Sequence, residues 1–144
     1  MSALRDAIVT HLQANATVTA LATGGIYPGL PPEGAETFPF ITVLPFKAVK
    51  PQKAFRGGGT VTDEVVFEEA IYTVKAIDRG ISGDSVADIV SAVRTALDGA
   101  TPTMTGYTAI NLEWIGDIPE YSELANSQHY QHQGAQFRIW AKTT

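Results

Sequence analysis

A strand pattern followed by a helix pattern, over residues 65–99, constrains the fold more than any other part of the chain. In "VVFEEAIYTVKAID" (65–78), apolar residues occupy both alternating sets of positions. Because successive strand residues point to opposite faces, both faces of this strand are partly apolar, and we expect it in the middle of a sheet. "SGDSVADIVSAVRTALDG" (82–99) has apolar residues at helical spacing instead, in a single stripe made of Val86, Ile89, Val90, Val93 and Leu97. This stripe predicts a helix that packs on one face of the sheet.

Two segments of the chain are expected to form the main helices, and a short helical turn lies between them. Ser82, Asp84 or Ser85 is suited to cap the start of the 82–99 helix, and Gly99 lies where a left-handed residue ends it. Near the N-terminus, 3–14 reads as a helix with Leu4, Ile8 and Leu12 at a spacing of four. A short helical turn follows in "TVTALATGG" (17–25), for which we expect Thr17 as cap and Gly24 as terminator.

The remaining segments read as strands and connections. Residues 26–40 are rich in proline, so they run extended, and 40–47 is a strand with Pro45 at an edge or bulge. A long connector is expected over 48–62, and further strands over 107–121, with a proline-interrupted end, and over 128–144. The order predicts an α+β fold: an antiparallel sheet packed by two main helices on one face, with a long projecting β-hairpin or loop. The length of 144 residues fits a single domain, 1–144, with residues 47–69 as its projecting arm.

Composition restricts the classes of function. The net charge of −5 argues against a dedicated nucleic-acid binder, which usually has a basic face. The chain has no cysteine, so disulfides, thiolate metal sites and cysteine nucleophiles are excluded. No apolar run is long enough to span a membrane, and the N-terminus lacks the apolar core of a signal peptide. We therefore expect synthesis and folding in a cytoplasm-like compartment.

Three short motifs suggest chemistry, and each is better explained by structure. "RGGGT" (56–60) is glycine-rich, but no Lys-Ser/Thr pair and no helix follows it, so a phosphate-binding loop is not predicted. "GISGD" (80–84) has an aspartate where a nucleophile elbow needs glycine, and it reads as a helix cap. His129 and His132 are three residues apart on a strand, hence on opposite faces and unable to share a metal. We predict no catalytic, cofactor-binding or metal-binding residues.

Charge is divided sharply along the predicted arm. Residues 47–56 carry cations and no anion, whereas 63–69 carry anions and no cation. Adjacent acids on a strand alternate faces, so Glu68 and Glu69 do not converge as a catalytic pair would. The two branches of an arm can neutralise each other, or the basic branch of one copy can meet the acidic branch of the next in a head-to-tail contact that closes into a ring. The candidate subunit or tube interface therefore comprises Lys47, Lys50, Lys53, Arg56, Gly57, Gly58, Gly59, Asp63, Glu64, Glu68 and Glu69.

The order and spacing of several segments resemble a known family. "ALRDAIVTHLQ" leads to "GGIYPGLPPEGAETFPFITV"; "YTVKAIDRGISGDSVADIVSAVRTALDG" follows, and "YQHQGAQFRIWAKT" closes the chain. Together they resemble the small tail-completion or tail-terminator proteins of long-tailed bacteriophages and related prophages. The resemblance spans nearly the whole chain, although each marker is weak by itself.

The resemblance implies a structural role in the virion, assembled in the host cytoplasm. Such proteins form a ring, commonly hexameric, at the head-proximal end of the tail, where they end tube polymerisation and present a surface to the head connector. The implied partners are other copies of the chain, the tail tube protein and a connector or neck protein, with weak contact to DNA passing through the lumen. It implies no enzyme activity, cofactor or membrane. The glycines at 57–59 would serve as a hinge or tip of an arm that orders on assembly.

Three other hypotheses remain open from the sequence. A head-closure or neck adaptor at the head–tail interface would have the same composition. A small hydrolase would use His11, His129 or His132. A nucleic-acid binder would use the cations of 47–56, and its affinity would fall steeply with salt.

Overall fold

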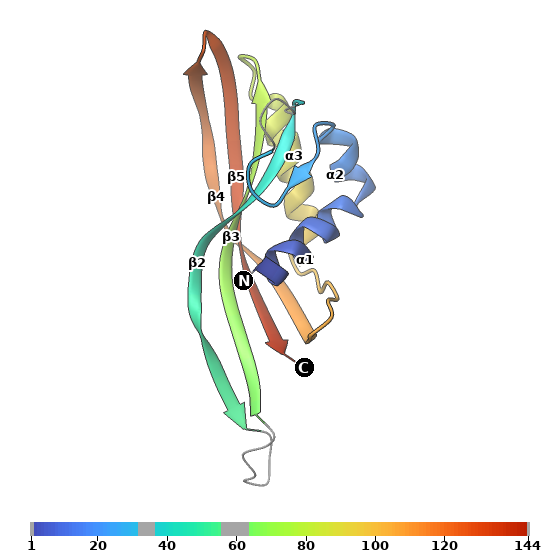
Figure 1. Ribbon diagram of the computed structural model, residues 1–144. Coiled ribbons are helices and arrows are strands. Elements are labelled where there is room, and N and C mark those ends of the chain that lie inside the picture. The colour runs from blue at the N-terminus through green and yellow to red at the C-terminus, as the bar shows by residue number, and fades with distance from the viewer. Residues whose placement is uncertain (1, 32–36, 56–63, 144) are drawn as a thin grey trace.

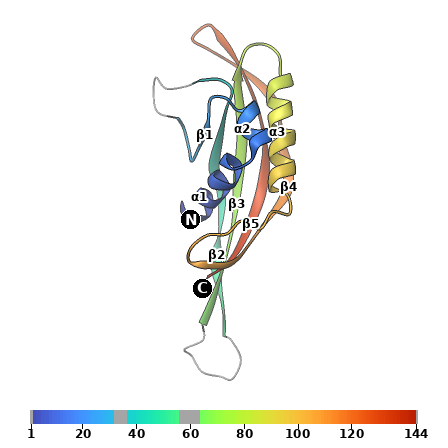
Figure 2. The same ribbon diagram turned by 90° about the vertical axis from the view of Figure 1, so that its right-hand side faces the viewer.

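A five-stranded sheet with helices on one face forms the protein (Figure 1). The computed structural model describes residues 2–31, 37–55 and 64–143. The elements in chain order are α1 (Ser2–Gln13), α2 (Ala16–Leu21), β1 (Ile26–Tyr27), β2 (Phe40–Phe55), β3 (Glu64–Arg79), α3 (Asp84–Leu97), β4 (Tyr107–Ala125) and β5 (Gln128–Thr143). Seen after a 90° turn, the helices again lie on the same face of the sheet (Figure 2). The predicted α+β class is confirmed.

The strand order is β1-β2-β3-β5-β4, and β3 lies in the centre as predicted. All pairs are antiparallel except the short β1–β2 pair, which is parallel. One face of β3 is buried under the helices through Ala70, Tyr72, Val74 and Ala76, and Thr73 and Ile77 are buried on the opposite face. On β5, Phe137, Ile139 and Ala141 continue this buried face. The core therefore lies between the sheet and the helices.

Helix α3 supplies the main apolar layer over the sheet. Every residue of its predicted stripe is buried, and Gly99 has the predicted left-handed φ of +75°. The start differs from the expectation, because Gly83 is the N-cap and no side chain caps it. Ser82 instead accepts a hydrogen bond from the Asp84 N–H at 3.3 Å.

The second helix begins earlier than predicted. Asn15, not Thr17, is its N-cap, and the Asn15 side chain accepts a hydrogen bond from the Val18 N–H at 3.0 Å. Asparagine caps at least as well as threonine, so the cap moves two residues upstream. The expected terminator Gly24 lies beyond the helix, where its N–H donates to the Pro39 carbonyl at 2.7 Å.

Two strands are longer than predicted. β2 continues through 48–55, which was expected to be a connector, because it pairs with β3 as far as Phe55 and Glu64. A bulge between Pro45 and Lys47 accommodates the proline, as expected. β4 likewise continues to Ala125, and its proline at 119 falls within a register shift between Ile118 and Tyr121.

Candidate subunit interface

The hairpin of β2 and β3 projects beyond the rest of the sheet. Beyond Phe67, which pairs with Lys142, the described residues of β3 have no pairing with β5, yet their pairing with β2 continues to Glu64 and Phe55. Figure 1 shows this hairpin extending past the C-terminal end of β5. A second shift of register, between Val49 and Gln52, lies within the projecting part. Local irregularities of this kind bend and twist a strand.

The structure describes part of the predicted interface set. Lys47 is exposed on β2, and Lys50 and Lys53 lie further along the same strand. Glu64 begins β3 opposite Phe55. Five of the predicted residues lie outside the described part of the chain, namely Arg56, Gly57, Gly58, Gly59 and Asp63.

The acids Glu68 and Glu69 point to opposite faces of β3 and make separate contacts within the chain. Glu68 Oε2 accepts a hydrogen bond from the Tyr107 hydroxyl at 3.0 Å. Burial, together with this hydrogen bond, raises the pKa of Tyr107 above its usual value. Glu69 Oε1 lies 2.9 Å from Arg138 Nε, and the same guanidinium lies 3.6 Å from Glu113. As expected, the two carboxylates do not converge.

Two aromatic residues, Phe67 and Trp140, lie beside this ion pair on the sheet face opposite the helices. Phe67 stacks on Trp140 with ring centroids 5.1 Å apart. Phe46, on β2, is 64% exposed beside the predicted lysines. Aromatic side chains are enriched at protein–protein interfaces relative to the rest of the surface.

Both lateral edges of the sheet have long stretches without a neighbouring strand. On its outer side β2 pairs with β1 only at Ile41 and Thr42, so among the described residues no strand flanks 43–55 there. β4 is the opposite edge. Its Leu112 exchanges backbone hydrogen bonds with Gly99 and Ala100, which leaves 115–125 as the unflanked part among the described residues.

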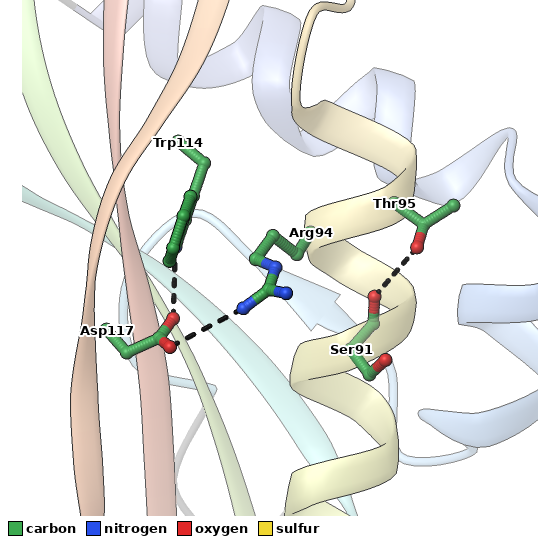
Figure 3. A network of polar contacts seen from close by, with 5 residues as sticks. All are labelled: Ser91, Arg94, Thr95, Trp114 and Asp117. Carbon is green, nitrogen blue, oxygen red and sulfur yellow. Dashed lines mark hydrogen bonds and ion pairs between the residues drawn. The ribbon is translucent and has the colours of Figure 1, made fainter.

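A polar cluster attaches the end of α3 to β4 (Figure 3). The Arg94 guanidinium lies 4.4 Å from the Trp114 ring centroid and 3.6 Å from Asp117 Oδ2. Trp114 Nε1 donates to Asp117 Oδ1 at 3.0 Å, and Thr95 on the helix donates to the Ser91 carbonyl at 3.1 Å. The two Arg94 contacts join α3 to β4, whereas the Trp114–Asp117 and Thr95–Ser91 hydrogen bonds each lie within one element.

A hollow of about 660 Å³ lies at the other end of the sheet, lined in part by Phe38, Phe40, Tyr130 and His132. His132 is buried and stacks on Tyr121, with ring centroids 4.6 Å apart. Burial, and then the positive charge of Lys75, lower the pKa of His132, while Glu123 at 3.8 Å opposes them.

The three histidines do not gather into one site. His11 Nε2 lies 3.1 Å from the Ala96 carbonyl oxygen between α1 and α3, and His129 and His132 are exposed and buried respectively. Within the described residues, no group of three His, Asp or Glu side chains is placed to hold a metal. In that part of the chain, no helix is long and apolar enough to cross a membrane.

The acids of β4 were missing from the sequence-based interface. Residues 107–125 contain four acids, Glu113, Asp117, Glu120 and Glu123, and no lysine or arginine. Their uniform sign was a signal available in the sequence. The sequence-based interface did not include them because Pro119 indicated that this end of the strand frays.

Comparison with known proteins gives two findings. The family model described as "Tail completion protein gp17" matches residues 6–140. A chain in a structure titled "Virion of native gene transfer agent (GTA) particle" is similar with a TM-score of 0.64 and 17% sequence identity, over 97% of this chain and 95% of that chain. At this identity the likeness concerns the fold. No curated protein matches the sequence.

Proposed function

We propose that this chain, which belongs to the tail completion protein gp17 family, forms a ring at the head-proximal end of the tail. Membership of that family makes it a structural component of the tail of a phage-like virion and not an enzyme. In the proposed role the ring, most simply a hexamer, ends polymerisation of the tail tube and provides the surface to which the head joins. The chain acts as one domain, with 47–69 as its arm.

The projecting β2–β3 hairpin is the observation that carries this proposal. Where this hairpin extends past β5, backbone groups at its edges have no pairing strand among the described residues. Its β2 branch carries only positive charge, through Lys47, Lys50 and Lys53, while β3 begins with acids. A surface with unlike ends favours head-to-tail contacts, and such contacts close into rings when the rotation between copies permits.

The ring has two further partners in this proposal. One face binds the last ring of tail tube protein, and the other binds a connector or neck protein. DNA passes through the lumen, where contact stays weak and non-specific because the chain is acidic overall, with a net charge of −5.

Deleting the gene from its phage or prophage tests this role. Without a terminator, tails should grow beyond their normal length and fail to join heads, and expression of the intact protein should restore both properties. Tails of normal length that join heads would contradict the proposal. Tails of normal length that remain headless would assign the chain to the alternative role, a head-closure or neck adaptor.

A further inference from the structure

We propose that neighbouring copies pair edge to edge: the free edge of β2 in one copy, residues 43–55, adds to the free edge of β4 in the next, residues 115–125. The pairing rests on the ring proposed above and names the surfaces that close it. It differs from the arm-to-arm contact predicted from the sequence, in which the basic branch meets acids of 63–69.

Unpaired backbone on both strands supplies the first argument. A strand at the edge of a sheet presents unpaired N–H and C=O groups, which can bind another strand. Among the residues that the structure describes, these groups on β2 begin beyond Thr42, where pairing with β1 ends. On β4 they begin beyond Trp114, whose N–H donates to Asp98 Oδ1 at 3.1 Å.

Charge supplies the second argument. The free stretch of β2 contains Lys47, Lys50 and Lys53 and no acid. The free stretch of β4 contains Asp117, Glu120 and Glu123 and no lysine or arginine. Two β2 edges repel each other, as do two β4 edges, while β2 and β4 attract. The charges therefore select the head-to-tail contact over a symmetric dimer.

Strand direction is compatible with this contact. β2 is antiparallel to β3, β3 to β5, and β5 to β4, so β2 and β4 run in opposite directions. A neighbour placed in the same orientation then brings its β2 antiparallel to β4. The alternation of strand direction continues unbroken from one copy to the next.

The positions of the free stretches require an offset along the strands. Lys47 pairs with Ile71, Ile71 with Arg138, and Arg138 with Glu113. Lys47 is therefore level with Glu113, which follows Leu112, the β4 residue already hydrogen-bonded to the segment after α3. Placing Lys47 opposite Glu120 shifts the neighbour by about seven residues, or roughly 23 Å. Strands in closed barrels tilt by about 35–45°, which staggers successive strands in this way.

The acids of the hairpin are less suited to be partners for the lysines. Glu69 already pairs with Arg138, and Glu68 accepts the Tyr107 hydroxyl. By contrast Glu123 is 55% exposed, although it lies 3.8 Å from His132. Glu120 is exposed as well, although its carboxylate lies against Gly83 at the start of α3.

Zero-length carbodiimide cross-linking tests the contact directly, because it joins lysine amines to carboxylates in ion pairs. The assembled protein, as a purified ring or in purified tails, would be cross-linked and mapped by mass spectrometry of mixed light and heavy copies. We expect links between copies from Lys47, Lys50 or Lys53 to Glu120 or Glu123. Links between copies to Glu68 or Glu69, or none from the β2 lysines, would overturn the edge pairing.

Charge reversal provides an independent test. Lys47→Glu/Lys50→Glu makes both edges acidic, and Glu120→Lys/Glu123→Lys makes both basic. Each variant alone should lose at least about tenfold in self-association, since like charges then face each other. A 1:1 mixture should assemble again in alternating order. Asp6→Lys/Asp88→Lys, with the same change in charge as Glu120→Lys/Glu123→Lys but at exposed helical positions, should assemble as the native protein does.

The results of these experiments distinguish a failure of the edge pairing from a failure of the ring proposal. Folding of each variant is checked by circular dichroism, and the cross-link map decides alone if a variant is unfolded. Folded variants whose mixture does not assemble would contradict edge pairing and leave the ring intact. A native protein that makes no contact between copies, even in purified tails, would overturn the ring and the pairing together.

Discussion

At the scale of single residues, Gly24 lies just after α2, where its backbone packs closely against that of Thr37 and Pro39. A Cβ atom at this position would overlap the backbone carbonyl of Thr37 and meet that of Pro39. The Gly24 N–H also donates to the Pro39 carbonyl, so the contact is both tight and directional. Glycine is needed here for close packing of backbone, not to end a helix.

Gly24→Ala should therefore destabilise the protein by about 1–3 kcal/mol, because the backbone must move to admit the methyl group. Urea unfolding followed by circular dichroism measures the change. Gly116→Ala is the matched control, since nothing lies within 4 Å of a Cβ there. Equal effects of the two substitutions would refute the steric explanation.

His132 makes stability depend on pH. Burial and Lys75 hold its pKa in the folded protein below the ordinary value of 6.5, so the unfolded chain binds the proton more readily. Stability should accordingly fall as the pH drops below about 6.5 and level off below the folded pKa. The unfolding midpoint in urea, measured between pH 8 and pH 5, checks this.

His132→Gln should flatten that pH dependence, and His129→Gln, at an exposed site on the same strand, is the control substitution. The same slope in the native protein and in His132→Gln would assign the proton uptake to another group.

At the scale of elements, α3 contributes most to the apolar layer on the sheet, and Leu97 is fully buried at its end. Leu97→Ala should cost about 2–5 kcal/mol through lost burial and the cavity that remains. Asp88→Ala, on the exposed side of the same helix, should change the free energy of unfolding by less than about 0.5 kcal/mol. Denaturant unfolding compares the two, and a small effect at Leu97 would mean that α3 is not an essential part of the core.

Sequence patterns predicted those elements whose buried face follows from the spacing of apolar residues within the element itself. The stripe of α3 and the alternation of β5 identify their faces without reference to other segments. The strand at 48–55 could not be found in this way, because its lysines, proline and glutamine have low strand propensity and only pairing with β3 makes it extended. The two-residue strand β1 depends on its pairing with the distant β2, and the Asn15 cap depends on one hydrogen bond from the Val18 N–H.

The candidate interface was predictable in part for the same reason. The sequence identified the lysines of β2, whose shared sign is visible locally. It did not show that β2 and β4 lie at opposite edges of one sheet, since strand order arises from pairing between distant segments. Only that order relates the basic strand to the acidic one.

At the scale of the whole molecule, an acidic chain with one basic strand should bind DNA weakly. We expect a Kd above about 1 μM at physiological salt, with a steep dependence on salt concentration. Lys50→Ala/Lys53→Ala/Arg56→Ala should remove that salt dependence, as measured by fluorescence anisotropy with a duplex. Tight binding that persists at high salt would contradict a purely structural role.

The mass of the native protein in solution, measured by light scattering after size exclusion and again in purified tails, tests self-assembly most directly. We predict a closed species near six times the subunit mass of 15.4 kDa, free or on the tail tube. A species of 15.4 kDa at every concentration, absent from tails, would contradict the account.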